Sequence, residues 1–484
     1  MKSRPRLILT HPALAIVGVY LVVGALFAWY TPIWQAPDEP AHYNYIRALA
    51  SGEGFPIMES GDYDQQKLQR LTSEGFPAEL SIETLEYEDH QPPLYYLLAT
   101  PIFWLSGGSV FALRLFTLVL GAVGVVMTLN LMTFFFPDAP HLVWLGGGTV
   151  AFIPQFLSIT ASVNNDALAF ALLWLWLWLA LKFLQGSGSP WLLGGVAGAL
   201  LITKSTGYGV LILMPFVVLL RQRRMGHPWH WALREAAQMM LPALIVGALW
   251  WGRNVMVYGW PDLMGLQAHN AVVEGQPRTQ DWLVQYGAGP LLRMGIRTTF
   301  QSFWGQFGWM GVVRDARIYL SLALLSTLTV VGAVWRLIIW MRRSLQNRRQ
   351  DGLALIGVSG LITVGMYLWY NLSFVQHQGR YLFPALPVVA LIAALGFIQW
   401  RVRRFAITGT LLIALLIVIL GIVRAITGSP SIWTLGLIGL TIPGILITTY
   451  WPKDAESWWV ALFLTALVGL DLWSLFGFLV PALR

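Results

Sequence analysis

The sequence predicts an all-α integral membrane protein with a single transmembrane domain, residues 1–484. Hydrophobic residues make up 56% of the chain and charged residues only 11%, too few to cover a water-facing surface of this size. Apolar runs recur from end to end, so no stretch the length of a soluble domain is left over. Lys and Arg gather in short clusters between these runs, as the positive-inside rule describes for membrane proteins.

The net charge of +8 therefore reflects membrane topology, and no nucleic-acid partner is expected. The chain has no cysteine, which excludes disulfides, thiolate metal sites and Cys nucleophiles. Its first apolar run follows a basic N-terminus, as in a signal peptide, but ends in Trp-Tyr-Thr-Pro without a small-residue cleavage site. We expect this run to be retained as a span.

A span needs about 20 apolar residues at about 1.5 Å each. About thirteen are predicted, at residues 12–30, 110–135, 141–162, 166–185, 190–204, 206–220, 234–257, 317–340, 352–373, 380–399, 404–424, 431–450 and 457–480. Residues 94–105 are also apolar, but as a helix they would cover only about 18 Å of a bilayer of about 30 Å. We expect them to form an interfacial or re-entrant helix.

The basic clusters support this reading of residues 94–105. If that stretch does not span, three clusters fall on the same side as the basic N-terminus. The residues concerned are Lys2, Arg4 and Arg6, then Arg221, Arg223 and Arg224, then Arg342, Arg343, Arg348 and Arg349, and finally Arg401, Arg403 and Arg404. This predicts a multi-pass protein of the bacterial plasma (inner) membrane whose N-terminus is cytoplasmic.

Two long loops then lie on the outer face, at residues 31–108 and 259–316. The first holds 12 of the 23 acids of the chain, which suits the outer side. Helical periodicity recurs in both loops, as in 41–50, where Tyr45, Ile46 and Leu49 form an apolar stripe. The loops are therefore expected to form helices along the membrane surface.

The first candidate for chemistry follows the first span, in Pro37-Asp38-Glu39-Pro40-Ala41-His42-Tyr43. Asp38 is a good helix N-cap, and Pro40 stands where a helix accepts proline. Alternatively, Asp38 or its neighbour Glu39 is a general base at the headgroup layer, with a pKa raised by partial burial. Both readings can hold together.

A metal site is a weaker alternative in the same region. Asp38 and His42 are four residues apart on a helix and could share Mg or Mn with Asp89 or His90. We expect no required cofactor.

The end of the first loop reads Glu88-Asp89-His90-Gln91-Pro92-Pro93-Leu94-Tyr95-Tyr96. The prolines stop any preceding helix and redirect the chain. His90 and Gln91 remain free to meet the Asp38 region, because the loop must return to the same bundle. His90 is a candidate contact of the donor, and His42, Asp89 and Gln91 are candidate contacts of the acceptor or the sugar.

Further ionisable groups are predicted near the outer ends of spans, where buried charge is expensive and usually paired or functional. Asp166 is either the N-cap of its helix or a substrate contact. Arg380, in Gln376-His377-Gln378-Gly379-Arg380-Tyr381, either snorkels to the interface or binds a phosphate through its planar guanidinium. Lys204 would add a point charge to the same phosphate. His377 and Tyr381 are candidate neighbours of that donor site.

The second outer loop contains Phe303-Trp304-Gly305-Gln306-Phe307-Gly308-Trp309. Such aromatics commonly anchor a protein at the membrane interface. Trp304 could alternatively stack on a sugar.

These motifs resemble the C-type glycosyltransferases, multi-span enzymes that use polyprenyl-phosphate sugars and include protein O-mannosyltransferases and the aminoarabinose transferase of lipid A. The closer resemblance is to a family of bacterial membrane proteins of unknown function related to these enzymes. It carries Pro-Asp-Glu-Pro-Ala-His, Gln-Pro-Pro-Leu-Tyr-Tyr, Asn-Asp-Ala-Leu, Phe-Trp-Gly-Gln-Phe-Gly-Trp and Gln-Gly-Arg-Tyr-Leu-Phe-Pro in this order, over roughly residues 12–400.

The resemblance implies the fold of those enzymes, Asp38 as catalytic base, Glu39 as its neighbour, and Arg380 and Lys204 as ligands of the lipid phosphate. Here His90-Gln91-Pro92-Pro93 stands where the better-known enzymes commonly read His-Pro-Pro.

The function expected is inverting transfer of a sugar from a polyprenyl-phosphate donor to a hydroxyl of a glycan, lipid or protein acceptor on the outer face. No nucleotide-binding glycine motif is present, which fits a lipid-linked donor. A transporter or lipid-linked glycan flippase, a glycan polymerase and a non-catalytic scaffold remain as alternatives. A transporter would need charges near mid-membrane, whereas these candidates fall near the outer rim.

Overall fold

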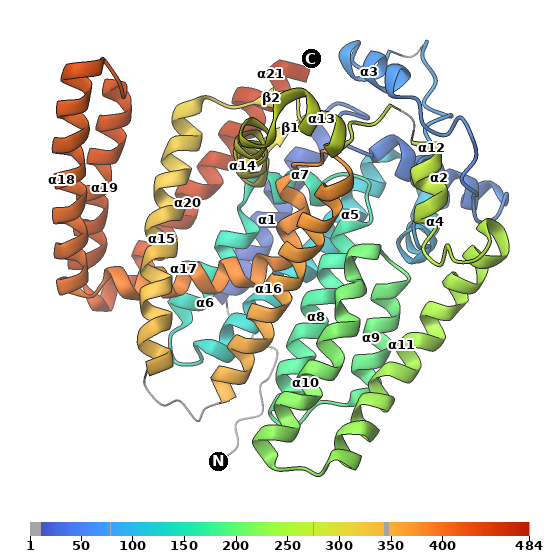
Figure 1. The fold of residues 1–484 in the computed structure, drawn as a ribbon, viewed down its shortest axis with the longest axis horizontal. Helices are drawn as coiled ribbons and strands as arrows, with labels where there is room; N and C mark the ends of the chain where they lie inside the picture. Colours follow the sequence, from blue (N-terminus) through green and yellow to red (C-terminus); the bar gives the residue numbers. More distant parts are fainter. Residues whose placement is uncertain (1–10, 78, 274, 343–347, 484) are drawn as a thin grey trace.

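Helices make up almost the whole architecture (Figure 1). The computed structural model describes residues 11–77, 79–273, 275–342 and 348–483. Among these residues, 11 helical segments are long and apolar enough to cross a membrane, or up to 12 if a bent pair is one span. The prediction of an all-α membrane protein is therefore confirmed.

The segments that qualify as spans include several with a short irregular turn at one end. In chain order they are α1 (His11–Tyr30), α5 (Val110–Phe135), α8 (Asp166–Leu184), η1 (Ser205–Gly209) with α10 (Val210–Met225), α11 (Trp229–Tyr258), α15 (Ala316–Arg342), α16 (Arg348–Ser373), η2 (Gly379–Ala385) with α17 (Leu386–Trp400), α18 (Arg403–Thr427), α19 (Ile432–Tyr450), and η3 (Lys453–Ala455) with α20 (Glu456–Ser474), η4 (Leu475–Leu479) and α21 (Val480–Leu483).

The expected thirteen spans differ from this set in two places. The expected span 141–162 is a bent pair, α6 (Pro140–Ala151) and α7 (Pro154–Thr160), at an angle of 62°. The bend falls at Pro154, which has no N–H to continue the helix. The expected span 190–204 contains α9 (Pro190–Leu201), which at 12 residues is short for a bilayer.

Helix α9 packs closely on α11. A Cβ atom added to Gly194 would lie 2.3 Å from the carbonyl oxygen of Met239, and one added to Gly198 would lie 2.9 Å from Cβ of Val246. Small residues four apart allow two membrane helices to approach in this way. The close contact fixes the C-terminal end of α9, which lies three residues before Lys204.

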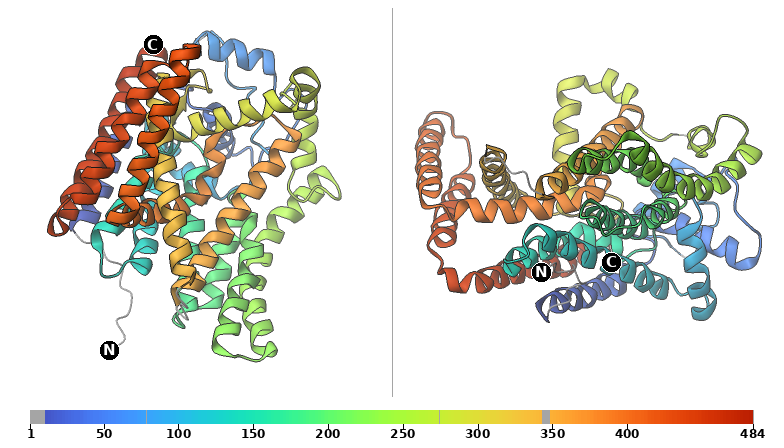
Figure 2. Two further views of the ribbon diagram at one scale, coloured as in Figure 1. Left: turned by 60° about the vertical axis from the view of Figure 1, so that its left-hand side comes forward. Right: turned by 90° about the horizontal axis from the view of Figure 1, so that it is seen from below.

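The two long loops cover the same end of the helix bundle (Figures 1 and 2). We call this end the loop face and define it by residues 31–109 and 259–315. The first loop forms α2 (Glu39–Ser51), α3 (Gln65–Ser73) and α4 (Leu94–Ser106); the second forms α12 (Leu266–Val272), α13 (Thr279–Tyr286), α14 (Ala288–Gly305), β1 (Gln306–Phe307) and β2 (Val312–Val313). Strands β1 and β2 are antiparallel, with Gln306 opposite Val313.

Helix α4 contains the residues expected not to span. It has 13 residues, which is shorter than any candidate span. Helices α10 and α15 end, and α18 begins, at the end of the bundle opposite the loop face (Figure 1). The basic clusters of these helices therefore share one side, as expected, although Lys2, Arg4, Arg6, Arg343 and the side chain of Arg348 lie outside the described residues.

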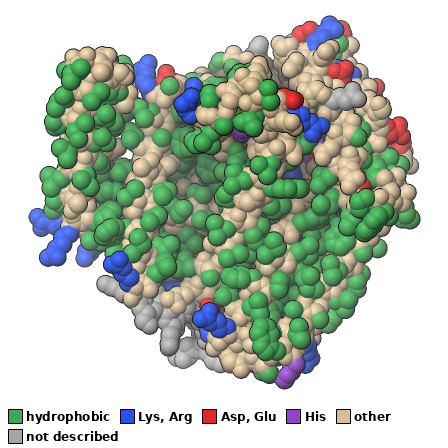
Figure 3. Space-filling model, viewed as in Figure 1, with side chains coloured by type: hydrophobic (Ala, Val, Ile, Leu, Met, Phe, Trp, Pro, Cys, Tyr) green, Lys and Arg blue, Asp and Glu red, His purple; other side chains and the backbone are tan. Residues whose placement is uncertain are grey.

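Hydrophobic side chains cover the visible flank of the bundle, and Lys and Arg gather toward its two ends (Figure 3). The largest apolar core lies between α1, α5, α8 and their neighbours, where Trp174 and Trp176 are fully buried. Helices α18 and α19 stand at one edge (Figures 1 and 2), and most of their surface is uncovered. Exposed apolar helices of this kind are typical of lipid contact.

Candidate active site

Asp38 lies between α1 and α2, at the N-cap position of α2, but its side chain makes no capping hydrogen bond. Its carboxylate instead forms an ion pair with Arg380 from η2 and accepts a hydrogen bond of 3.1 Å from the Tyr87 hydroxyl. Its φ of 66° is the left-handed conformation, which costs a non-glycine residue about 1 kcal/mol or more. Helix capping therefore does not account for this residue.

The charge state of Asp38 differs from the expectation of a raised pKa. Burial alone would raise the pKa of Asp38, but Arg380, with His42 and Lys204, holds it below its ordinary value. The expected upward shift was wrong because the guanidinium partner, 342 residues away in the chain, could not be paired with Asp38 from the sequence. Asp38 is ionised at neutral pH.

Glu39 has different surroundings from Asp38. It is fully buried, and Arg114 of α5 donates to its two oxygens at 2.8 and 2.6 Å. The backbone N–H groups of Val163 and Trp34 donate to it at 3.1 Å each. Arg114 also donates to the carbonyl oxygens of Ala28 and Thr31. The contacts of Glu39 therefore favour a structural role.

Lys204 and Asp166 form a second ion pair, at 2.8 Å, and Lys204 also donates to Oδ1 of Asn165 at 2.7 Å. Asp166 is the first residue of α8 and not its N-cap, so the capping reading was wrong. Asn165 is the N-cap, and the side chain of Asn164 before it accepts from the Asp166 N–H at 2.9 Å. Lys204 is close enough to Asp38 for its positive charge to help lower the pKa of Asp38.

The turn before α4 brings Gln91 and His90 into the same region. The side-chain oxygen of Gln91 accepts from Asn165 at 3.3 Å. The His90 ring lies 4.4 Å from the ring of His269 in α12. Burial, and then His269, lower the pKa of His90 well below its ordinary value, so His90 is neutral and adds no positive charge to the site.

Two carboxyl groups of this turn have raised pKa values. Burial, and then the neighbouring Glu86, raise the pKa of Asp89 to about 9. Burial, and then the charge of Asp38, raise the pKa of Glu88 to about 8. One buried oxygen of Glu88 has no hydrogen-bond partner within the described residues. Two carboxyl groups with pKa values moved in opposite directions, here Asp38 and Glu88, are a frequent property of acid–base sites.

Sequence reasoning missed Glu88 and Tyr87 as members of the site. Glu88 stands in the same acidic run as Asp89 and His90, so the signal was present, but the choice between adjacent acids depends on the turn. Tyr87 carried no signal of its own in the sequence.

In the part of the chain that the structure describes, no three His, Asp or Glu side chains are grouped so as to hold a metal ion. His42 instead makes a 2.8 Å hydrogen bond between Nδ1 and the Tyr96 hydroxyl. Burial, and then Lys204, lower the pKa of His42 to about 3.

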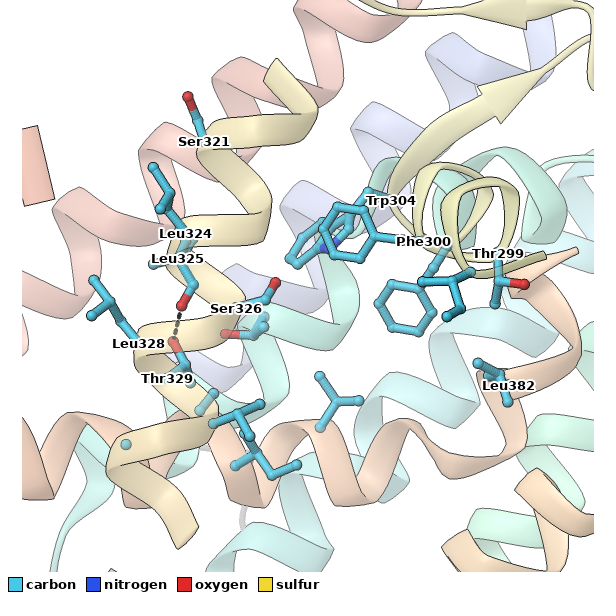
Figure 4. A pocket seen from close by; sticks show the side chains of 18 of the residues that line it. Thr299, Phe300, Trp304, Ser321, Leu324, Leu325, Ser326, Leu328, Thr329 and Leu382 are labelled. Carbon is cyan, nitrogen blue, oxygen red and sulfur yellow. Dashed lines mark hydrogen bonds between the residues drawn. The ribbon is translucent and has the colours of Figure 1, made fainter. Parts of the chain in front are cut away.

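A large apolar cavity of about 1120 Å³ lies on the other side of η2, between α14, α15, α17 and α19. His377 and Trp304 line it, so neither joins the Asp38 group. Figure 4 shows Phe300 and Trp304 of α14 across from Leu325 and Thr329 of α15. Trp304 is 7% exposed and packs in the core beside this cavity, so a sugar that stacks on it would have to enter the cavity.

Arg380 and Leu382 connect the ion pair to this cavity, because they are two residues apart in η2. Leu382 lines the cavity, whereas Arg380 contacts Asp38. Tyr381 lies beside Arg380, with the guanidinium 5.3 Å from the ring centre, and its ring lies 5.6 Å from that of Tyr370. The geometry therefore places a charged group and a large apolar cavity beside the same short helix, η2.

A family model described as "Predicted membrane protein (DUF2142)" matches residues 81–389, which is more than half of the chain. The chain belongs to this family. The match includes Glu88, Lys204 and Arg380 but begins after Asp38. No curated protein matches this DUF2142 member.

Solved structures show the fold. ArnT from Cupriavidus metallidurans bound to undecaprenyl phosphate is similar with a TM-score of 0.53 and 13% identity, over 97% of this chain and 77% of ArnT. The apo state of ArnT gives 0.53 and 14%, over 96% and 76%. An oligosaccharyltransferase from Archaeoglobus fulgidus, in complex with Zn and sulfate, gives only 0.42 and 12%, over 91% and 53%. The DUF2142 chain thus has the membrane fold of ArnT, a C-type glycosyltransferase architecture.

Proposed function

We propose that this protein is an inverting glycosyltransferase that takes a sugar from a polyprenyl-phosphate carrier at the outer face of a bacterial plasma membrane. The observation that carries the proposal is the Asp38–Arg380 pair, which sets a carboxylate beside a phosphate-binding type of cation. The shared fold with ArnT, whose structure contains undecaprenyl phosphate, supports the same chemistry.

The reaction follows from these groups. Asp38 accepts the proton of an acceptor hydroxyl, the hydroxyl oxygen bonds to the anomeric carbon, and the bond from that carbon to the phosphate oxygen breaks. The carrier phosphate leaves with its negative charge stabilised by Arg380 and Lys204. Because a bound phosphate competes with Asp38 for Arg380, donor binding raises the pKa of Asp38 and makes it a stronger base.

The apolar cavity suits the carrier chain. Its volume of about 1120 Å³ and its lining of Leu, Phe and Ile side chains fit an isoprenoid tail. The tail reaches the headgroup site past Leu382, next to Arg380. The orientation follows from the basic clusters, which lie opposite the loop face and are expected in the cytoplasm.

The test is incubation of the purified chain in lipid nanodiscs with a panel of polyprenyl-phosphate sugars, with release of the carrier phosphate as readout. We expect turnover or slow hydrolysis of at least one donor. Carrier binding without turnover of any donor, together with movement of the carrier across liposomes, would support a flippase instead.

A further inference from the structure

A second cavity, of about 500 Å³, lies in the loop face between α12 and α13. Its lining is largely polar, in contrast to the cavity beside α14. The polar and aromatic side chains that line it are those of Asn270, Gln276, Arg278, Asp281, Gln285 and Trp282. Its volume falls within the range of about 300–1,000 Å³ that is usual for small-molecule sites.

The cavity wall is fixed to the helix bundle. Arg278 pairs with Phe374 as an antiparallel bridge, and its guanidinium lies 4.1 Å from the centre of the Phe374 ring. Thr279 donates from its hydroxyl to the Asn371 carbonyl at 2.8 Å, and the Val375 N–H donates to Pro277 at 3.0 Å. These contacts hold the cavity at the end of α16.

The same wall is packed against the support of Asp38. Val273 lines the cavity and is buried in an apolar cluster with Phe374 and Tyr87. Tyr87 donates to Asp38, and His269 of α12 contacts His90. The cavity and the candidate base therefore share one set of packed side chains.

The lining favours a carbohydrate over other ligands. Amide, carboxylate and guanidinium groups satisfy the paired donors and acceptors of sugar hydroxyls, and a tryptophan offers an apolar surface for the C–H face of the ring. Gln276 lines the cavity, and its buried side-chain oxygen has no hydrogen-bond partner within the described residues. Among the lining residues that the structure describes, one cation and one anion, Arg278 and Asp281, balance each other.

We infer that this cavity binds a saccharide unit of the acceptor, which makes the acceptor a glycan. The acceptor role of the bound glycan rests on the proposed function, whereas glycan binding by the cavity does not.

Binding can be tested with the full-length chain in nanodiscs on an array of bacterial envelope polysaccharides and oligosaccharides. We expect retention on at least one glycan, a loss of about tenfold or more in affinity for Trp282→Ala and for Gln285→Ala, and no change for Gln280→Ala, an exposed neighbour outside the lining. Absence of glycan binding by the wild type, or binding unaffected by both lining substitutions, overturns the inference.

Transfer separates this inference from the proposed function. We expect Trp282→Ala to keep donor hydrolysis while losing transfer to the bound glycan. Loss of hydrolysis and transfer together in Trp282→Ala, or transfer only to lipid or protein acceptors, contradicts the acceptor role. Glycan binding by a wild type that uses no donor contradicts the proposed function and leaves the glycan site standing.

Discussion

Asp38 and Glu39 are adjacent carboxylates whose partners give them different tasks. Glu39 has both oxygens bonded to Arg114 and to backbone N–H groups, so it has no capacity left for a substrate. Asp38 has one cation and one hydroxyl, and its charge is balanced by the group that a phosphate would contact. Pairing with Arg380 leaves Asp38 as the candidate base, and pairing with Arg114 makes Glu39 structural.

Glu88 gives a pH-dependent stability. Its pKa is raised to about 8 in the folded chain, above its ordinary value of 4.5, so the folded state holds a proton that the unfolded state releases. Stability contributed by this group is therefore lost as pH rises from about 4.5 to 8. We expect the melting temperature of Glu88→Gln to rise relative to that of the wild type as the pH increases from about 4.5 to 8.

The measurement is thermal unfolding in detergent at pH 5, 6, 7 and 8, with the exposed Glu53→Gln as control. A difference between Glu88→Gln and wild type that stays constant with pH would show that Glu88 is ionised throughout.

The site residues that could be predicted from the sequence were charged side chains within a short recognisable motif, such as Asp38 and Arg380. Their pairing could not be read from it, because 342 residues separate them. Lys204 was nominated as a phosphate ligand, and its partner Asp166 was nominated separately. Pairings of this kind depend on helix packing, which a single sequence does not specify.

At the scale of elements, the Glu39–Arg114 pair connects the end of α1, the start of α2 and α5. Arg114 reaches carbonyl oxygens of Ala28 and Thr31 while it holds Glu39. Because Asp38 is the next residue, this pair fixes the position of the candidate base.

Glu39→Gln should destabilise the folded chain by about 3 kcal/mol or more, because it leaves a buried guanidinium without its counter-charge. Thermal unfolding checks this, with Glu83→Gln, an exposed ion-pair partner of Arg47, as control. If Glu39→Gln were as stable as wild type but inactive, Glu39 would be catalytic and the structural assignment would be wrong.

Element boundaries were predictable where a long apolar run ends at a polar or capping residue. The expected span 110–135 coincides with α5, whose N-cap Ser109 accepts from the Ala112 N–H. The bend between α6 and α7 was not predicted, since the run remains apolar through Phe152 and Ile153. Hydropathy identifies an apolar segment but not a change in helix direction, and the change here occurs at Pro154.

For the whole molecule, the arrangement of both loops on one end predicts a topology. Because the chain has no cysteine, single cysteines can be introduced without background. We expect Ser73→Cys in α3 to react with a membrane-impermeant maleimide in intact bacterial cells, and Met225→Cys at the end of α10 to react only after permeabilisation. Labelling of both in intact cells would contradict the orientation.

The most direct test of the central claim compares Asp38→Asn with wild type for sugar transfer from the donor found active in the polyprenyl-phosphate panel. Both proteins must be folded and membrane-inserted, and Asp64→Asn, which keeps the cap of α3, serves as control. We predict that Asp38→Asn loses about 100-fold or more of the transfer rate, since general-base catalysis contributes about that much, while the control is unchanged. Near wild-type transfer by Asp38→Asn would contradict the account.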